Sequence, residues 1–85
     1  MTELRSRLGR VVKQLRQQRG ITQQQLAVKA KLHRTYVSDV ERGTRNLSIT
    51  SLDQIAVARD TPLSEVFKRV ETANAEELTK VAGAR

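Results

Sequence analysis

Apolar positions along this chain recur every three or four residues from near its start to about residue 70. This is the spacing of helices that bury one face. The first helix is predicted over about residues 4–19, with Arg and Lys on its other face, and Gly20 is suited to end it in a left-handed conformation. Its inward-facing residues are Leu4, Leu8, Val11, Val12 and Leu15.

Two short helices joined by a tight turn are predicted next. Thr22 and Gln25 have the spacing of a capping box, in which each side chain binds a backbone N–H group at the start of a helix. The following helix is predicted over about residues 33–42, and Gly43 ends it. The inward-facing residues of this pair are Leu26, Ala27, Ala30, Leu32, Val37 and Val40.

Two more helices are predicted after a polar loop at residues 44–48. Thr50 or Ser51 is suited to cap the fourth helix. Thr61 and Pro62 have the pattern of a cap followed by proline at the first helical position. The inward-facing residues are Leu52, Ile55 and Ala56 in the fourth helix, and Leu63, Val66, Phe67 and Val70 in the fifth.

These elements predict an all-α domain, a compact five-helix bundle over residues 1–71. A tail over residues 72–85 follows, either as a short helix or as a disordered segment, because Ala, Glu and Lys dominate it. At 85 residues the chain has room for one core. With one Tyr, one Phe and no Trp, that core is aliphatic, which suits a helical bundle better than a β-sandwich.

Positive charge is concentrated in the first half of the chain. Residues 1–46 hold 11 Lys or Arg and 3 acidic residues, whereas residues 47–85 hold 5 and 6. This asymmetry favours one face for a polyanion and another surface for a different role. Taken alone, this charge distribution is equally consistent with a solvated basic surface that only aids solubility.

The composition argues against several other classes of protein. Without Cys there is neither a disulfide nor a thiolate metal site, and His33 is the one histidine. No glycine-rich phosphate loop is present and Glu76-Glu77 lies in the tail, so we expect no enzyme, cofactor or metal. The apolar runs are too short to span a membrane and the start lacks the apolar core of a secretory signal, which predicts a cytoplasmic protein.

The most informative motifs extend over residues 8–69. They are Leu8-Gly9-Arg10, Leu15-Arg16, Ile21-Thr22-Gln23, Leu26-Ala27, Arg34-Thr35-Tyr36-Val37-Ser38, Glu41-Arg42-Gly43, Arg45-Asn46, Leu52 and Ile55-Ala56. This set resembles the Xre family of helix-turn-helix regulators and, within it, the controller proteins of restriction–modification systems. The resemblance implies a transcriptional regulator that binds double-stranded DNA in the major groove as a homodimer and regulates its own operon.

The start of the predicted 33–42 helix carries side chains suited to DNA. The Arg34 guanidinium can bridge two guanine acceptors in the major groove, or bind a phosphate. Thr35 can contact a base or cap its helix, and Tyr36 can contact DNA or pack on the domain surface. The expected DNA-binding residues, with Gln23 added by the resemblance, are Gln23, Arg34, Thr35, Tyr36, Ser38, Asp39, Thr44, Arg45 and Asn46.

The resemblance also implies an ion pair between Arg16 and Glu41 that holds the 33–42 helix on the bundle. Two-fold pairing places two reading helices about 34 Å apart, one turn of DNA. The near-neutral second half of the chain is expected to form the homodimer interface. Its candidate residues are Leu63, Val66, Phe67 and Val70.

Three positions depart from the family pattern. Lys31 stands where the turn usually has Gly, and His33 stands where a Ser or Thr cap is usual. Arg59 replaces a buried Leu, so either its stem snorkels or the fourth helix ends earlier. No small-molecule ligand is evident. Other functions considered are a phage-type repressor, an antitoxin that represses its own operon, and an adaptor that binds proteins instead of DNA.

Overall fold

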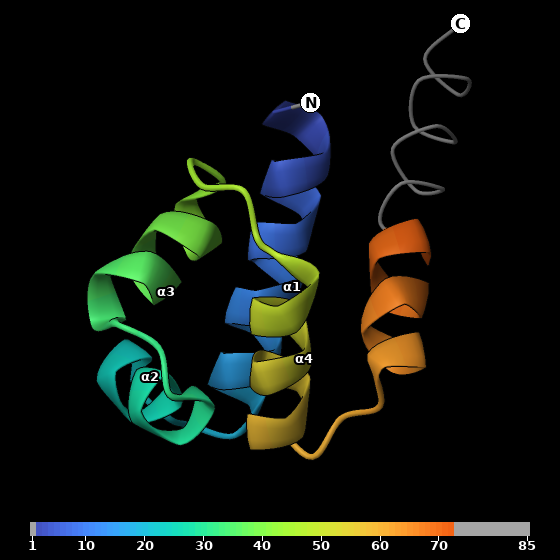
Figure 1. Cartoon of the computed structure of the whole chain (residues 1–85). Helices are drawn as coiled ribbons and strands as arrows, with labels where there is room; N and C mark the ends of the chain where they lie inside the picture. Colours follow the sequence, from blue (N-terminus) through green and yellow to red (C-terminus); the bar gives the residue numbers. More distant parts are fainter. Residues whose placement is uncertain (1, 73–85) are drawn as a thin grey trace, which may run out of the picture.

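The computed structural model describes residues 2–72, so the predicted tail lies outside the described residues apart from Thr72. Within that range the chain is helical and contains no strand, which confirms the all-α fold class (Figure 1). None of the described helices is long and apolar enough to cross a membrane. The helices are α1 (Thr2–Gln18), α2 (Gln23–Ala30), α3 (Arg34–Arg42), α4 (Ile49–Ala58) and a last helical segment, helix 63–72.

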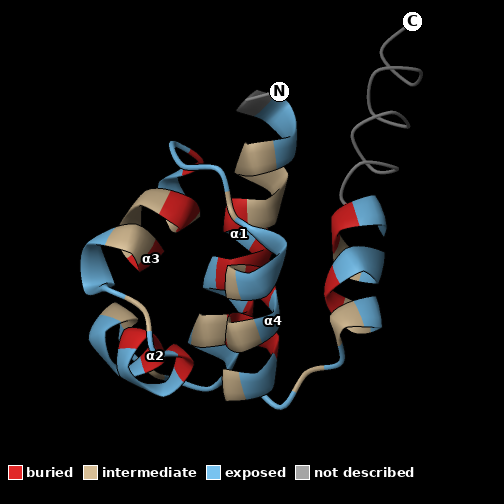
Figure 2. Ribbon diagram, viewed as in Figure 1, coloured by how far each residue is buried: buried red, intermediate tan, exposed pale blue. Residues whose placement is uncertain are grey.

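Helix α1 is the central element of the bundle, with α3 on one side and helix 63–72 on the other (Figure 1). Its adjacent residues Val11 and Val12 belong to two different core clusters, and the buried positions of the other helices turn toward these clusters (Figure 2). One cluster contains Val12, Leu26, Ala27, Ala30, Val37, Val40 and Ile55. The other contains Val11, Leu15, Leu52, Ala56, Val66 and Val70.

Helix α2 begins where its capping box predicts, and α3 ends at Gly43 as expected. The Thr22 hydroxyl accepts from the Gln25 N–H and the Gln25 side chain accepts from the Thr22 N–H, which completes the capping box. Lys31 takes a left-handed conformation with φ of 60° at the end of α2. A non-glycine residue there costs about 1 kcal/mol. His33 precedes α3 without a side-chain capping bond, so the family's usual cap is absent.

Helix α4 starts earlier than the sequence predicted. Ser48, not Thr50 or Ser51, is its capping residue, and the Ser48 hydroxyl accepts from the Ser51 N–H at 3.0 Å. Ser48 has an extended backbone, with φ of −69° and ψ of 156°, as a capping residue requires. Three Ser or Thr residues lie within four positions here, and only the backbone conformation selects one of them.

The connection from α4 to helix 63–72 also differs in detail. The Thr61 hydroxyl donates to the Arg59 carbonyl at 3.0 Å and does not cap the next helix. The Pro62 carbonyl accepts from the Glu65 N–H at 2.9 Å, so proline immediately precedes helix 63–72. Asp60 between them has a positive φ of 50°. The chain therefore reverses direction over these few residues.

Of the two alternatives for Arg59, the earlier end of the fourth helix is the one observed. Helix α4 ends at Ala58 with Arg59 as its capping residue, yet the Arg59 residue is only 5% exposed. Its Nε and Nη1 atoms are buried without a hydrogen-bond partner. Burial, and then the neighbouring charges of Arg19 and Arg69, lower the pKa of Arg59. Simple snorkelling of the guanidinium into solvent was therefore wrong.

Helices α1 and α3 approach closely at Gly9. A Cβ atom at this position would lie 2.3 Å from the Val40 carbonyl oxygen and 2.9 Å from the Glu41 carbonyl oxygen. These contacts are far shorter than any van der Waals separation, so only glycine fits between the two backbones. Gly9 thus sets how closely α3 lies against α1.

Candidate nucleic-acid interface

The first turn of α3 presents free polar side chains to solvent. Arg34 and Thr35 are both exposed, and neither side chain makes a hydrogen bond or ion pair with any residue in the described range. The N–H groups at a helix start carry a partial positive charge, which adds to that of the guanidinium. This end of α3 can therefore donate to an anion or to base acceptors without breaking an internal contact.

The opposite end of α3 is fixed by the expected ion pair. Arg16 Nε donates to Glu41 Oε2 at 2.7 Å, and Arg16 Nη2 donates to Glu41 Oε1 at 3.0 Å. The Glu41 side chain is only 3% exposed, and that of Arg16 is 13% exposed. Two parallel bonds between a guanidinium and a carboxylate fix geometry as well as charge. The hydrogen bond to Glu41 raises the pKa of Arg16, which stays protonated.

Gln23 joins this pair to the start of α2. Its Nε2 atom donates to Glu41 Oε1 at 3.0 Å, so one carboxylate oxygen serves both Gln23 and Arg16. A third Arg16 nitrogen, Nη1, donates to the Ile21 carbonyl at 2.9 Å. Gln23 thus braces α3 against α2 through Glu41. Its expected contact with DNA remains a prediction.

Ser38 and Asp39, further along α3, are engaged within the protein. The Asp39 carboxylate pairs with Arg42, and Arg42 Nη1 also lies 3.4 Å from the Ser38 hydroxyl. Thr44 caps the end of the helix, because its N–H and its hydroxyl both donate to the Asp39 carbonyl, at 3.0 and 3.1 Å. Ser38 and Asp39 are therefore already bonded inside the protein, although the Ser38 hydroxyl can still donate and Asp39 Oδ2 can still accept.

Tyr36 connects α3 to the loop that follows it. Its hydroxyl donates to the Asn46 carbonyl at 3.4 Å and accepts from the Ser48 N–H at 3.3 Å. The Arg45 guanidinium lies over the Tyr36 ring, 5.0 Å from its centre, as a cation–π contact requires. Tyr36 is half-buried. Of its two expected roles, packing on the domain is the one present in the free protein.

A hollow of about 470 Å³ opens beside these residues. It lies between the α2–α3 turn, the first turns of α3 and the start of α4. Its lining residues are Lys31, Leu32, His33, Thr35, Tyr36, Asp39, Arg45 and Ser51. Four of the expected DNA-binding residues, Thr35, Tyr36, Asp39 and Arg45, thus line this hollow. The loop residues Thr44, Arg45 and Asn46 are all exposed.

The expected dimer interface needs correction at two positions. Val66 is 0% exposed and Val70 is 7% exposed, and both belong to the internal cluster shared with α1 and α4. Neither side chain is available to a partner. Phe67 is 41% exposed and Leu63 is half-buried, so these two remain candidates.

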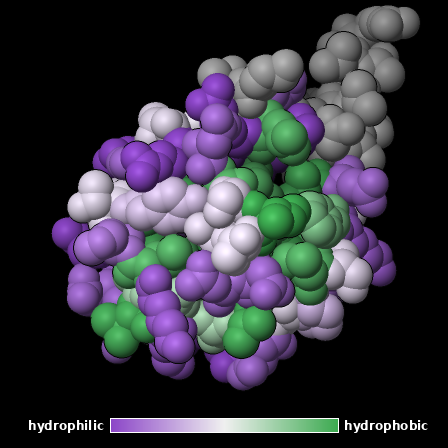
Figure 3. Space-filling model, in the orientation of Figure 1, coloured by the Kyte–Doolittle hydropathy of each residue, from purple (hydrophilic) through white to green (hydrophobic). Residues whose placement is uncertain are grey.

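Val57 on α4 is a further exposed apolar side chain that the sequence analysis missed. It is 69% exposed and follows Ala56, which packs toward helix 63–72. Hydrophobic side chains gather between α4 and helix 63–72 in the space-filling view (Figure 3). The sequence did contain a sign of this exposure, because Val57 is apolar but falls outside the inward-facing positions of α4. We name Leu63 and Phe67 on helix 63–72 the apolar flank.

Among the described residues, no group of three or more His, Cys, Asp or Glu is placed to hold a metal ion.

Comparison with known proteins places this geometry in a family. A helix-turn-helix family model matches residues 12–66. Control protein C.MunI of Mycoplasma sp is 35% identical over 72 residues, covering 84% of this chain and 97% of that protein. Control protein C.BamHI of Bacillus amyloliquefaciens is 43% identical over 56 residues, covering 65% of this chain and 69% of that protein.

A solved structure extends the likeness to three dimensions. The restriction–modification controller protein C.Esp1396I, solved as a tetramer in complex with its natural 35 base-pair operator, has 38% sequence identity and a TM-score of 0.76. The match covers 81% of this chain and 91% of that one. The chain therefore belongs to the Xre-type helix-turn-helix family, as a relative of the restriction–modification controller proteins.

Proposed function

We propose that this protein is a sequence-specific transcriptional regulator that binds a pseudo-palindromic operator as a homodimer and controls a restriction–modification operon that includes its own gene. The observation that carries the proposal is the start of α3, where Arg34 and Thr35 are exposed and free of internal partners. A recognition helix enters the major groove by this end. Because its partner is the cell's DNA, we place the protein in the cytoplasm.

Dimerisation follows from the size of one recognition helix. A single α3 contacts only a few base pairs, which is too few to select one operator in a genome. A two-fold dimer doubles the contacts and fixes the spacing of the half-sites. The apolar flank supplies a surface for this pairing, and the operator-bound tetramer of the similar C.Esp1396I supports assembly on DNA.

The experiment that tests the function measures binding to DNA from upstream of the protein's own gene. Fluorescence anisotropy is recorded at fixed salt with excess competitor DNA. We expect Arg34→Ala to weaken specific binding by about 30-fold or more, because a guanidinium bound to guanine contributes on the order of 1–3 kcal/mol and the dimer loses two of them. Its thermal midpoint should match wild type, since Arg34 has no internal partner.

Lys68→Ala is the matched control, because it also removes one positive charge but lies on helix 63–72, with α1 between it and α3 (Figure 1). We expect its operator affinity to stay within about twofold of wild type, as for a distant surface charge. Equal losses in both variants would mean that only net charge attracts DNA. A protein that prefers no fragment over competitor would be an adaptor, and the proposal would be wrong.

A further inference from the structure

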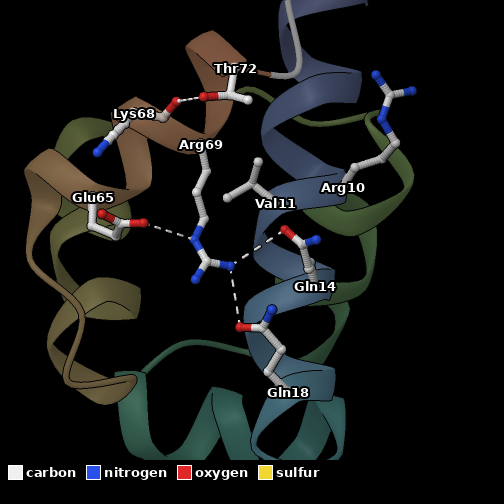
Figure 4. A pocket seen from close by; sticks show the side chains of 8 residues that line it. All are labelled: Arg10, Val11, Gln14, Gln18, Glu65, Lys68, Arg69 and Thr72. Atoms are coloured by element: carbon white, nitrogen blue, oxygen red, sulfur yellow. Dashed lines mark hydrogen bonds and ion pairs between the residues drawn. The ribbon is translucent and has the colours of Figure 1, made fainter. Parts of the chain in front are cut away.

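A second surface lies on the side of α1 away from α3. A groove of about 540 Å³ runs between α1 and helix 63–72 (Figure 4). Gln14 and Gln18 point into it from α1, and Arg69 points into it from helix 63–72 (Figure 4). Because α1 separates this groove from α3, the groove stays accessible when α3 contacts another molecule.

The groove is lined by polar and basic groups. Its basic lining residues are Arg10, Lys68 and Arg69, its acidic one is Glu65, and Val11 is the one apolar lining residue in the described range. An apolar helix would leave these polar groups without partners on binding, which is costly. A polar, negatively charged segment fits the lining better.

Arg69 organises this lining. Its Nε atom donates to Glu65 Oε2 at 3.2 Å, and its Nη1 atom lies 3.2 Å from Gln18 Oε1 and 3.5 Å from Gln14 Oε1. The one carboxylate of the groove is thus already used inside the protein. Since both glutamine oxygens face the guanidinium, both glutamine NH2 groups are left as donors for an added acceptor.

The Arg59 side chain behind the groove is poorly compensated. The Arg59 guanidinium is buried with Nε and Nη1 unpartnered, and the charge of Arg69 is close enough to lower the pKa of Arg59. Arg19 adds to this repulsion, and Asp60 opposes it only weakly from an exposed position. Negative charge placed near Arg69 would offset the repulsion among these arginines.

We propose that this groove is a docking site for an acidic segment of a protein partner, whose carboxylates pair with Lys68 and Arg69 and accept from the side-chain amides of Gln14 and Gln18. A DNA duplex is too broad to enter a space between two packed helices, so a peptide segment is the polyanion that fits. This site is separate from the proposed operator contact and does not depend on it.

The test uses the full chain and a short fluorescein-labelled peptide of alternating Glu and Ala, with a Gln–Ala peptide as its neutral counterpart. We expect binding of the Glu peptide only, and in amide-resolved NMR the side-chain NH2 signals of Gln14 and Gln18 should shift. Lys68→Glu should weaken binding roughly fivefold, because one attraction becomes a repulsion at an exposed site. Lys29→Glu on α2 makes the same change in net charge and should alter affinity less than about twofold.

Several outcomes would overturn the proposal. Equal weakening by Lys68→Glu and Lys29→Glu, or equal binding of both peptides, would show no selective groove. A change in sedimentation of Lys68→Glu would make the groove a contact between copies of this chain. Loss of operator binding in Lys68→Glu would place DNA there instead. Failure of the peptide to bind while Arg34→Ala still loses operator affinity would overturn the groove proposal alone.

Discussion

At the residue scale, the side chains that hold α3 are distinct from those that are free to contact DNA. Glu41 is buried and bonded to both Arg16 and Gln23, whereas Arg34 is exposed and has no partner in the described range. Substitutions at the first set should change stability, and substitutions at Arg34 should change binding. The two kinds of effect can therefore be measured separately.

Removing Arg16 tests the brace. We expect Arg16→Ala to lower the free energy of unfolding by about 3 kcal/mol, because the Glu41 carboxylate is left buried without its charge partner. In a domain of this size that corresponds to a fall of roughly 12 °C or more in the thermal midpoint measured by circular dichroism. Arg19→Ala is the control, since its pair with Asp60 is exposed and should contribute less than about 1 kcal/mol. An unchanged midpoint for Arg16→Ala would remove this role.

Replacing Arg59 is expected to raise the stability of the protein, whereas replacing Arg16 should lower it. Arg59→Leu should raise the free energy of unfolding by about 1 kcal/mol, because it removes two buried N–H groups without partners and a charge next to other arginines. Urea unfolding followed by circular dichroism measures the change. A less stable variant would mean that the guanidinium is well accommodated.

The sequence predicted the interactions of some individual residues but not those of others. The Arg16–Glu41 pair followed from the family resemblance, because its two positions are fixed by the fold that the motifs specify. The lack of partners for the Arg59 guanidinium did not, since it depends on which groups of helix 63–72 and α1 surround it. For Tyr36 the sequence could not decide between a DNA contact and packing on the domain. Its bonds to Asn46 and Ser48 depend on where the folded chain brings the 44–48 loop.

At the element scale, the contact between α1 and α3 determines where the recognition helix lies. Gly9→Ala should lower the free energy of unfolding by about 2 kcal/mol, because the added Cβ would meet the Val40 and Glu41 carbonyls and force the helices apart. Helix propensity alone predicts the opposite sign, a gain of up to about 1 kcal/mol. Gln17→Ala, at an exposed position of the same helix, controls for propensity.

Thermal unfolding distinguishes these two effects for Gly9. A stabilised Gly9→Ala protein would show that α1 and α3 can separate at little cost. The sequence predicted both helices correctly because their caps and apolar spacing are local. It did not predict that Gly9 lies at their contact, since the partner atoms are some thirty residues away along the chain.

At the scale of the whole molecule, the exposed polar start of α3 and the apolar flank lie on different helices, so we expect DNA binding and dimerisation to use different surfaces. Phe67→Asp should convert the dimer to a monomer in sedimentation velocity experiments, because a carboxylate in an apolar interface has no partner. The fold should persist, since Phe67 is 41% exposed in the single chain. Operator affinity should fall with dimer loss. Gln17→Asp, which places the same charge outside the apolar flank, should remain dimeric.

A substitution at Val66 tests whether this residue belongs to the core or to the dimer interface. Val66→Asp should unfold the protein, because this side chain is 0% exposed within the single chain. If Val66→Asp were instead folded and monomeric, Val66 would belong to the dimer interface after all. A dimeric Phe67→Asp variant would show that the apolar flank is not where two copies meet.

The sequence by itself determined the helices, their order, the position of the recognition helix and the family, because caps, turn residues and apolar spacing act over a few residues. Tertiary structure decided which apolar residues of helix 63–72 are core and which are surface, since that depends on how the helix is rotated against α1 and α4. It also decided that Arg59 is buried and that a basic groove lies beside α1. These features arise from side chains far apart in the chain, and only the packed bundle brings them together.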